Sequence, residues 1–414
     1  MEYEQHAPRL PWWATAPDTF ADRWTSVTSG NFVADTPAKR FAQRVTRCFM
    51  VVAPFGITKI TMLDDTIRGK PLLGIIQFAN LALMVWASMT GSARSHDKTR
   101  QKLLQTALSR CDVEQSTPLS TFVHGCSWLL FVVVLQLAGI ARAMMWATDE
   151  RVGPVWGLFS LIGFTIVPMG VLDTIKTASR WVNAARREIL RFGYTTIVML
   201  AADRKADRPE AGRAPRTKWA RQVSVLNTSE SKVSAFEVEV ERGEPPEGFT
   251  RARFEDAYEA ARDVVETMNE ILSGPLTALL CVFVGSEVLM VSFSQAKNKT
   301  ASEVALFRLF ALWIGILIVF LLKWLASVGD TFAKVVLDLL SPAYFMRLAL
   351  ALDQENSGSS GRGNNGLSEA ARHALLHSRL GFSLYNVTMT TDKLLYLIGT
   401  FVFYFIVSSA RSGS

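Results

Sequence analysis

The sequence predicts an all-α integral membrane protein with seven transmembrane helices, a cytosolic N-terminus and cytosolic extensions of the later helices. Two observations lead to this fold class. First, 49% of the 414 residues are hydrophobic, and they gather in long blocks. A bilayer core about 30 Å thick needs roughly 20 apolar residues of a helix. Second, Lys and Arg residues lie beside these blocks, where they act as topology signals.

Six stretches are long enough to cross a bilayer, and each is apolar on every face, which is rare for a soluble helix. They are Pro71–Thr90, Leu119–Trp146, Val152–Ile175, Gly274–Gln295, Val304–Ser327 and Lys393–Ser409. A weaker stretch, Cys48–Ile57, is interrupted by Pro54 and Gly56. By hydropathy alone, this stretch is half a span or an interfacial helix. Whether it crosses the membrane decides whether the chain has six spans or seven.

The distribution of basic residues predicts the orientation. Arg94–Arg110 and Lys176–Arg262 are both rich in Lys and Arg, and two strong spans separate them, so they fall on the same side. The positive-inside rule places that side in the cytosol. If the weak stretch also crosses, the N-terminus is cytosolic and Ser414 lies outside.

Amphipathic stretches predict helical extensions of the spans into the cytosol. In Thr250–Gly274, the apolar residues Phe254, Ala261, Val265 and Met268 recur at helical spacing and lead into a span. Ser179–Ala202 and Phe332–Leu352 show similar patterns, whereas Gln354–Gly366 is typical of a flexible linker. We expect the apolar faces of these extensions to meet in an oligomer, so polar substitutions at Val265 and Met268 should weaken assembly.

The chain is accordingly expected to divide into six segments. These are a cytosolic N-terminal segment (1–45), four spans with an extension of the fourth (46–203), a cytosolic loop (204–249), the fifth and sixth spans with a helical extension (250–328), a cytosolic helix and flexible loop (329–386), and the seventh span with an extracellular tail (387–414).

Catalytic and cofactor motifs give no support for an enzyme. The chain has no nucleophile elbow, no P-loop and no GxGxxG followed by an acidic residue. His373 and His377 stand at i and i+4, but no acidic residue completes an HExxH motif, so a solvated helical face is the preferred interpretation. The net charge of +7 is spread beside the apolar blocks rather than gathered on one module, which argues against nucleic-acid binding. We expect no cofactor and no metal.

Charged residues inside the spans are the first functional candidates, because an ion in lipid is costly unless it is paired or hydrated. Arg142 and Glu287 fall in the outer halves of their spans. Either they line a hydrated, ligand-binding cavity, or Arg142 snorkels while Glu287 pairs with it or with Arg308. Lys323 is interpreted as an interface anchor.

The predicted ligand site lies at the depth of these two charges, where four spans supply an aromatic and apolar wall. Its residues are Arg142, Met145, Trp156, Phe159, Glu287, Met290, Phe310 and Trp313. The alternative is a well-packed bundle in which the same aromatic residues fill the interior. A cavity of this kind would suit a small organic ligand with a polar end.

The C-terminal third resembles a known family in the order of its elements. A span (Val304–Ser327), a helix (Asp330–Leu352), a flexible loop and Leu380–Leu384 lead into Leu394–Val407. This order is similar to that of insect gustatory and odorant receptors and their gustatory receptor-like relatives. Their last span carries Thr-Tyr, five apolar residues and Gln-Phe. The corresponding residues here are Thr400-Phe401, Val402–Ile406 and Val407-Ser408. Val264–Ser273 resembles the family's helix just before the fifth span, and Pro54-Phe55-Gly56 lies where such proteins often begin their first span.

The resemblance implies a chemoreceptor-type, ligand-gated ion channel subunit of the plasma membrane. Its partners would be membrane lipid, a small organic ligand and further copies of the chain in a homotetramer, whose pore is formed by the seventh helix. The pore-lining residues would be Thr400, Tyr404, Val407, Ser408 and Arg411. Arg411 at the outer mouth would work against cation entry. Val407 stands where the family has Gln, so the family's ion selectivity does not carry over to this chain. The alternatives are a non-conducting seven-span scaffold or lipid-interacting protein and, less favoured because no internal repeat is visible, a secondary transporter.

Overall fold

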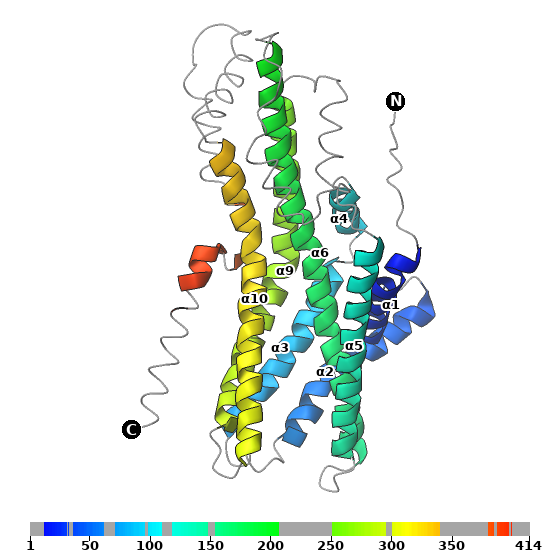
Figure 1. The fold of residues 1–414 in the computed structure, drawn as a ribbon. Helices are drawn as coiled ribbons and strands as arrows, with labels where there is room; N and C mark the ends of the chain where they lie inside the picture. Colours follow the sequence, from blue (N-terminus) through cyan, green and yellow to red (C-terminus); the bar gives the residue numbers. More distant parts are fainter. Residues whose placement is uncertain are drawn as a thin grey trace. The chain divides into compact units, whose positions relative to one another are not determined.

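The computed structural model describes residues 12–30, 32, 36–61, 71–95, 98–109, 118–147, 154–206, 251–294, 300–339, 380–384, 387–396 and 399. Helices make up nearly all of this part of the chain (Figure 1). They are α1 (Trp12–Thr28), α2 (Pro37–Thr61), α3 (Pro71–Ser95), α4 (Lys98–Ser109), α5 (Pro118–Ala147), α6 (Pro154–Ala206), α9 (Arg251–Ser294) and α10 (Ala301–Leu339), and residues 391–396 form a further short helix. The predicted all-α class is therefore confirmed.

A two-stranded hairpin is the only β-structure among the described residues. Strands β1 (Ser383–Leu384) and β2 (Val387–Thr388) pair antiparallel, with Ser383 opposite Thr388. The sequence analysis treated this stretch only as a lead into the last span.

Five helices of the described part are long and apolar enough to cross a membrane. The qualifying segments are Pro71–Gly91, Thr121–Ala141, Pro154–Thr196, Phe254–Ser292 and Gly315–Leu337. Each overlaps one of the stretches predicted from hydropathy, so the chain is a helical membrane protein. The sixth predicted stretch, Lys393–Ser409, lies mostly outside the described residues. The weak seventh stretch forms part of α2, which continues as one helix through Pro54.

Three helices combine a span with its predicted extension. α6, α9 and α10 are continuous over 53, 44 and 39 residues. At 1.5 Å per residue, α6 alone is about 80 Å long, far more than a hydrocarbon core of about 30 Å. These helices must therefore continue outside the membrane. The predicted helix Phe332–Leu352 is described only as far as Leu339.

The described helices belong to two compact units. The first comprises Met1–Gln101, Thr117–Arg180 and Asn269–Trp324, and the second comprises Lys102–Ser116, Trp181–Met268 and Leu325–Ser414. The boundaries fall within α4, α6, α9 and α10, so each of these helices contributes to both units.

In the first unit, contacts between helices fix their directions. α3 runs parallel to α6, because Gly170 lies against Ser88 and Gly91 lies against Thr174. α2 runs antiparallel to α6, since Met50 lies against Gly170 and Ile57 against Gly163. The C-terminal end of α3 therefore lies level with Thr174 of α6. This arrangement agrees with the prediction that the basic segments after these two helices lie on the same side of the membrane.

In the second unit, the extensions form a buried apolar core. Its residues include Trp181, Ile189 and Phe192 of α6, Phe254, Val265 and Met268 of α9, and Phe332, Val335 and Leu339 of α10. The Phe192 ring lies 5.5 Å from that of Phe254 and 5.6 Å from that of Tyr258. Val265 is 1% exposed and Met268 is 0% exposed within the single chain. Our reason for assigning these two residues to an oligomer interface was therefore wrong, because helices of the same chain already cover them.

Candidate functional site

Polar groups on the membrane helices are where a functional site is sought, because such groups are costly in lipid. Of the predicted ligand-site residues, the structure describes the side chains of Trp156, Phe159, Glu287 and Met290. Arg142 and Met145 belong to α5, and Phe310 and Trp313 to α10, but their side chains lie outside the described part. A pairing of Arg142 with Glu287 therefore stays a prediction.

The two aromatic residues at the start of α6 face α2. The rings of Trp156 and Phe159 are 5.9 Å apart, and the ammonium of Lys59 lies 4.1 Å from the centre of the Trp156 ring. A Cβ added at Gly56 would come within 2.8 Å of Phe159 Cβ, so α6 approaches the α2 backbone closely at this position. These contacts are ordinary helix packing with a cation–π pair at one end, and the sequence analysis did not foresee the role of Lys59.

Several polar side chains in the membrane helices carry a buried polar atom without a hydrogen-bond partner among the described residues, including Trp128 and Gln136 of α5. Two of them are Glu287 of α9, through Oε2, and Asn80 of α3, through Nδ2. Asn80 lies directly against Gly285, where a Cβ would overlap its amide. Because two residues turn a helix by about 200°, Glu287 points away from the face of Gly285 that meets α3. Each atom is a place where water or a polar ligand group would relieve a desolvation cost.

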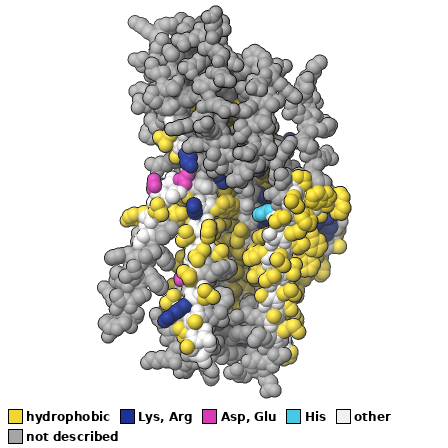
Figure 2. All heavy atoms as spheres, in the orientation of Figure 1, with side chains coloured by type: hydrophobic (Ala, Val, Ile, Leu, Met, Phe, Trp, Pro, Cys, Tyr) yellow, Lys and Arg dark blue, Asp and Glu magenta, His cyan; other side chains and the backbone are white. Residues whose placement is uncertain are grey.

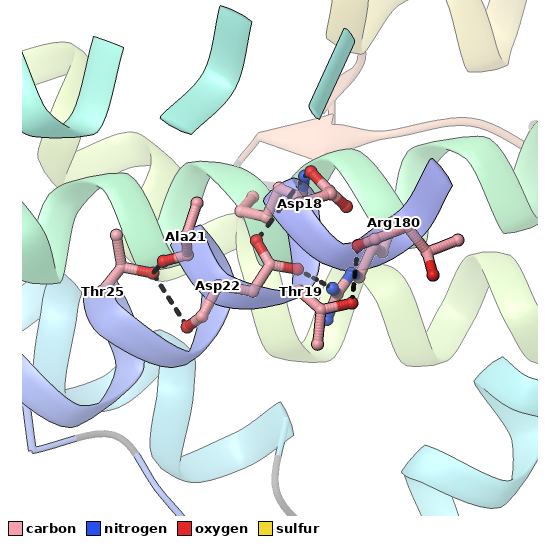
Figure 3. A network of polar contacts seen from close by, with 8 residues as sticks. Asp18, Thr19, Ala21, Asp22, Thr25 and Arg180 are labelled. Carbon is pink, nitrogen blue, oxygen red and sulfur yellow. Dashed lines mark hydrogen bonds and ion pairs between the residues drawn. The ribbon is translucent and has the colours of Figure 1, made fainter. Parts of the chain in front are cut away.

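An ionic network joins α1 to α6 in the first unit (Figure 3). Lys176 Nζ donates to Asp18 Oδ1 at 2.6 Å and lies 3.6 Å from Asp22 Oδ1, while Arg180 pairs with Asp22 Oδ2. Lys176 also lies 5.1 Å from the centre of the Trp128 ring of α5. Each helix presents its two charges at i and i+4, so the pairs face one another. Burial raises the pKa of the Asp22 carboxyl, and Arg180 and Lys176 partly oppose this effect.

The sequence analysis missed this network because it assigned residues 1–45 to a cytosolic segment and did not examine them for a helix. The signal was present in the spacing of Ala14, Ala21 and Thr25, which are buried on one side of α1. Asp18 and Asp22 stand beside that stripe. Nothing local, however, indicates that their partners are 158 residues away.

A second polar contact, in the second unit, holds the chain just before the last predicted span. Asp330 of α10 accepts hydrogen bonds from the backbone N–H of Thr391, at 3.1 Å, and from the Thr391 hydroxyl. A Cβ at Gly329 would lie 2.6 Å from the carbonyl oxygen of Met389, so the two segments touch through their backbones. The carboxylate thus caps the helix at residues 391–396.

The residues predicted to line a pore, Thr400, Tyr404, Val407, Ser408 and Arg411, all lie outside the described part of the chain. No protein-family model and no curated protein sequence matches this chain. A functional assignment therefore rests on the arrangement of the helices and on the polar contacts given above.

Proposed function

We propose that the chain is a gustatory receptor-like subunit of a chemoreceptor-type ligand-gated ion channel, a homotetramer of the plasma membrane with a pore formed by the seventh helix. One observation carries the proposal. The segment leading into the predicted seventh span is bonded, through Asp330 and Thr391, to the extension of α10. A helix held in this way at its inner end can be moved by the helices that surround it, as a pore-forming helix must be.

The count of seven spans requires that α2 cross the membrane, and its packing supports this. α2 lies against α6 from Gly170, which Met50 contacts, to Trp156, which Lys59 contacts. Between these two positions α6 rises roughly 21 Å, most of the hydrocarbon thickness. Met50, Ala53 and Ile57 are buried within the unit, which explains how a helix of modest hydropathy is accommodated.

A ligand site in the outer half of the membrane is part of the same proposal. Glu287 supports it, because its buried Oε2 has no protein partner among the described residues. A ligand with a hydrogen-bond donor at one end would supply that partner. Glu287→Gln should therefore change the response to any ligand found without preventing folding.

Recording from the purified protein in a planar bilayer tests conduction. In a variant without its native cysteines, Val407→Cys should make the current sensitive to block by a thiol-reactive cation. Leu137→Cys is the matched control, because Leu137 is exposed on the apolar face of α5 and lies outside the predicted pore. Block of both variants, or of neither, would contradict the pore assignment. A protein that inserts and assembles without conducting would favour the scaffold alternative.

Assembly is measured separately, by the mass of the detergent-solubilised protein. We expect four copies. A single monodisperse copy would contradict the tetramer while leaving the helical fold unaffected.

A further inference from the structure

α1 places its large side chains outward and its small ones inward. Trp12 is 80% exposed and Phe20 is 57% exposed, and Trp24 and Val27 are also exposed, whereas Ala14 and Ala21 are fully buried. At about 100° per residue, the exposed side chains share one face of the helix. A helix on the surface of a soluble protein shows the opposite arrangement, with its apolar stripe toward the core.

The exposed face of α1 adjoins a surface that must meet lipid. α1 lies along the first part of α5: the Trp13 ring is 5.8 Å from that of Phe122, and Ala21 packs with Val132. α5 is one of the membrane-spanning helices, and Leu130, Val134 and Leu137 are exposed on it. Figure 2 shows hydrophobic side chains gathered over α5 and the N-terminal helices.

The ionic network gives the depth of α1 relative to the membrane. From Pro154, where α6 begins, to Lys176 the helix rises roughly 33 Å, close to the thickness of the hydrocarbon core. Lys176 and Arg180 therefore lie at the edge of the hydrocarbon, where charges are tolerated. Asp18 and Asp22 hold the opposite face of α1 at this level.

We propose that α1 is an interfacial helix whose aromatic face, formed by Trp12, Phe20, Trp24 and Val27, inserts into the boundary between lipid headgroups and acyl chains. Trp is the residue that best suits this boundary, because its ring is apolar and its N–H can meet water or headgroups. Arg23 is exposed on the same face and is long enough to reach a lipid phosphate. The occupant of this face is thus the lipid leaflet rather than a protein partner. This inference does not depend on channel activity.

Spin labels on the cysteine-free protein in phosphatidylcholine–phosphatidylglycerol vesicles test the proposal. Labels at Phe20→Cys and Val27→Cys should collide more with oxygen, which concentrates in lipid, than with a water-soluble nickel chelate. Leu137→Cys is the lipid-exposed control. Glu259→Cys, an exposed residue on the α9 extension, is the aqueous control. All four side chains are exposed, so the labels should not disturb packing.

Two results would overturn the proposal. Labels on α1 that behave like the label at Glu259→Cys would show that water covers the aromatic face. Labels that are shielded from both reagents would show that another protein surface, such as a second copy of the chain, covers it. Agreement with the label at Leu137→Cys supports insertion into lipid.

Discussion

At several positions in this protein, contacts with a neighbouring helix determine which residue type can be accommodated. Gly285 is required by the Asn80 amide, which occupies the space where a side chain would lie. Asp22 pairs with two cations, Lys176 and Arg180, which favour its charged form, whereas burial disfavours that form. In both cases the residue type is determined by a helix distant in the sequence, and substitution should reveal that dependence.

Gly285→Ala should lower the stability of the protein by roughly 1–3 kcal/mol, because the added methyl group overlaps the Asn80 amide and that side chain, 7% exposed, has little room to turn away. Gly315→Ala is the matched control, since a Cβ there meets nothing within 4 Å. Thermal melts of the detergent-solubilised variants measure the difference. Adding Asn80→Ala to Gly285→Ala should restore part of the loss, and a purely additive double variant would contradict the overlap.

The pH dependence of stability should contain a contribution from Asp22. Burial raises its native pKa above the ordinary value of 3.8, so the folded protein binds this proton more tightly than the unfolded chain. The contribution of Asp22 to the free energy of unfolding therefore falls as the pH rises through the interval from 3.8 to the raised value. Asp22→Asn does not titrate and should lack this fall. Melting temperatures of the two proteins across acidic pH test the sign, and parallel curves would contradict it.

The short elements of the second unit are stabilised by contacts with other elements more than by their local sequences. The helix at residues 391–396 is short, and isolated helices of this length are marginal in water. Its first turn is held by Asp330 from α10, and the preceding hairpin is held by the bond from the Met389 N–H to the Phe382 carbonyl at 2.8 Å. The extension of α9 is held in turn by the core around Phe192.

Asp330→Ala should loosen the start of the helix at residues 391–396, because it removes both acceptors of Thr391. The loss of a helix cap costs about 1 kcal/mol, which corresponds to roughly five-fold faster amide exchange where exchange follows local opening. Hydrogen exchange followed by mass spectrometry measures the effect at residues 391–396. Asp392→Ala, at an exposed neighbouring position, should leave exchange unchanged. Equal effects of the two substitutions would show that charge alone, rather than the contact, matters.

Met268→Ala should destabilise the folded chain by about 2–5 kcal/mol, because it leaves a cavity in the core of the second unit. Glu259→Ala, at an exposed position of the same helix, should change stability by less than about 0.5 kcal/mol. Thermal melts compare the two variants. Below the melting temperature, Met268→Ala should keep the oligomeric state of the parent. Dissociation without loss of stability would show that Met268 does contribute to an interface between copies.

At the largest scale, the directions of α2, α3, α6 and α9 within the first unit are compatible with the positions of the basic segments between the spans. α3 runs antiparallel to α9, because Leu73 packs with Leu289 and Gly91 with Pro275. With α3 parallel to α6, the basic segment that begins at Arg94 continues from an end level with Lys176 and Arg180. These contacts show that the two ends lie together, and the side of the membrane that they face stays a prediction from the charges.

Cysteine labelling of a cysteine-free protein in cells tests that orientation. Gly361→Cys should react with an impermeant reagent only after permeabilisation, and Ser414→Cys should react in intact cells. Labelling of Gly361→Cys from outside would exclude the predicted topology. Of the three sequons, at Asn227, Asn298 and Asn386, only the one at Asn298 should face outward. Its short loop can keep it too near the bilayer for glycosylation, so a glycan on Asn227 or Asn386 is the informative result.

The sequence by itself determined the membrane helices and their extensions, because both are local properties. The length of an apolar run decides whether a helix can cross lipid, and the spacing of Phe254, Ala261 and Val265 decides which face of an extension is buried. Only the tertiary structure decided what those faces meet. Met268 is covered by its own chain rather than by a second copy, and Asp18 finds Lys176 on a helix far along the sequence. The choice of partner depends on how helices fit against one another, through glycines and small residues at particular heights, and periodicity within one segment does not contain that information.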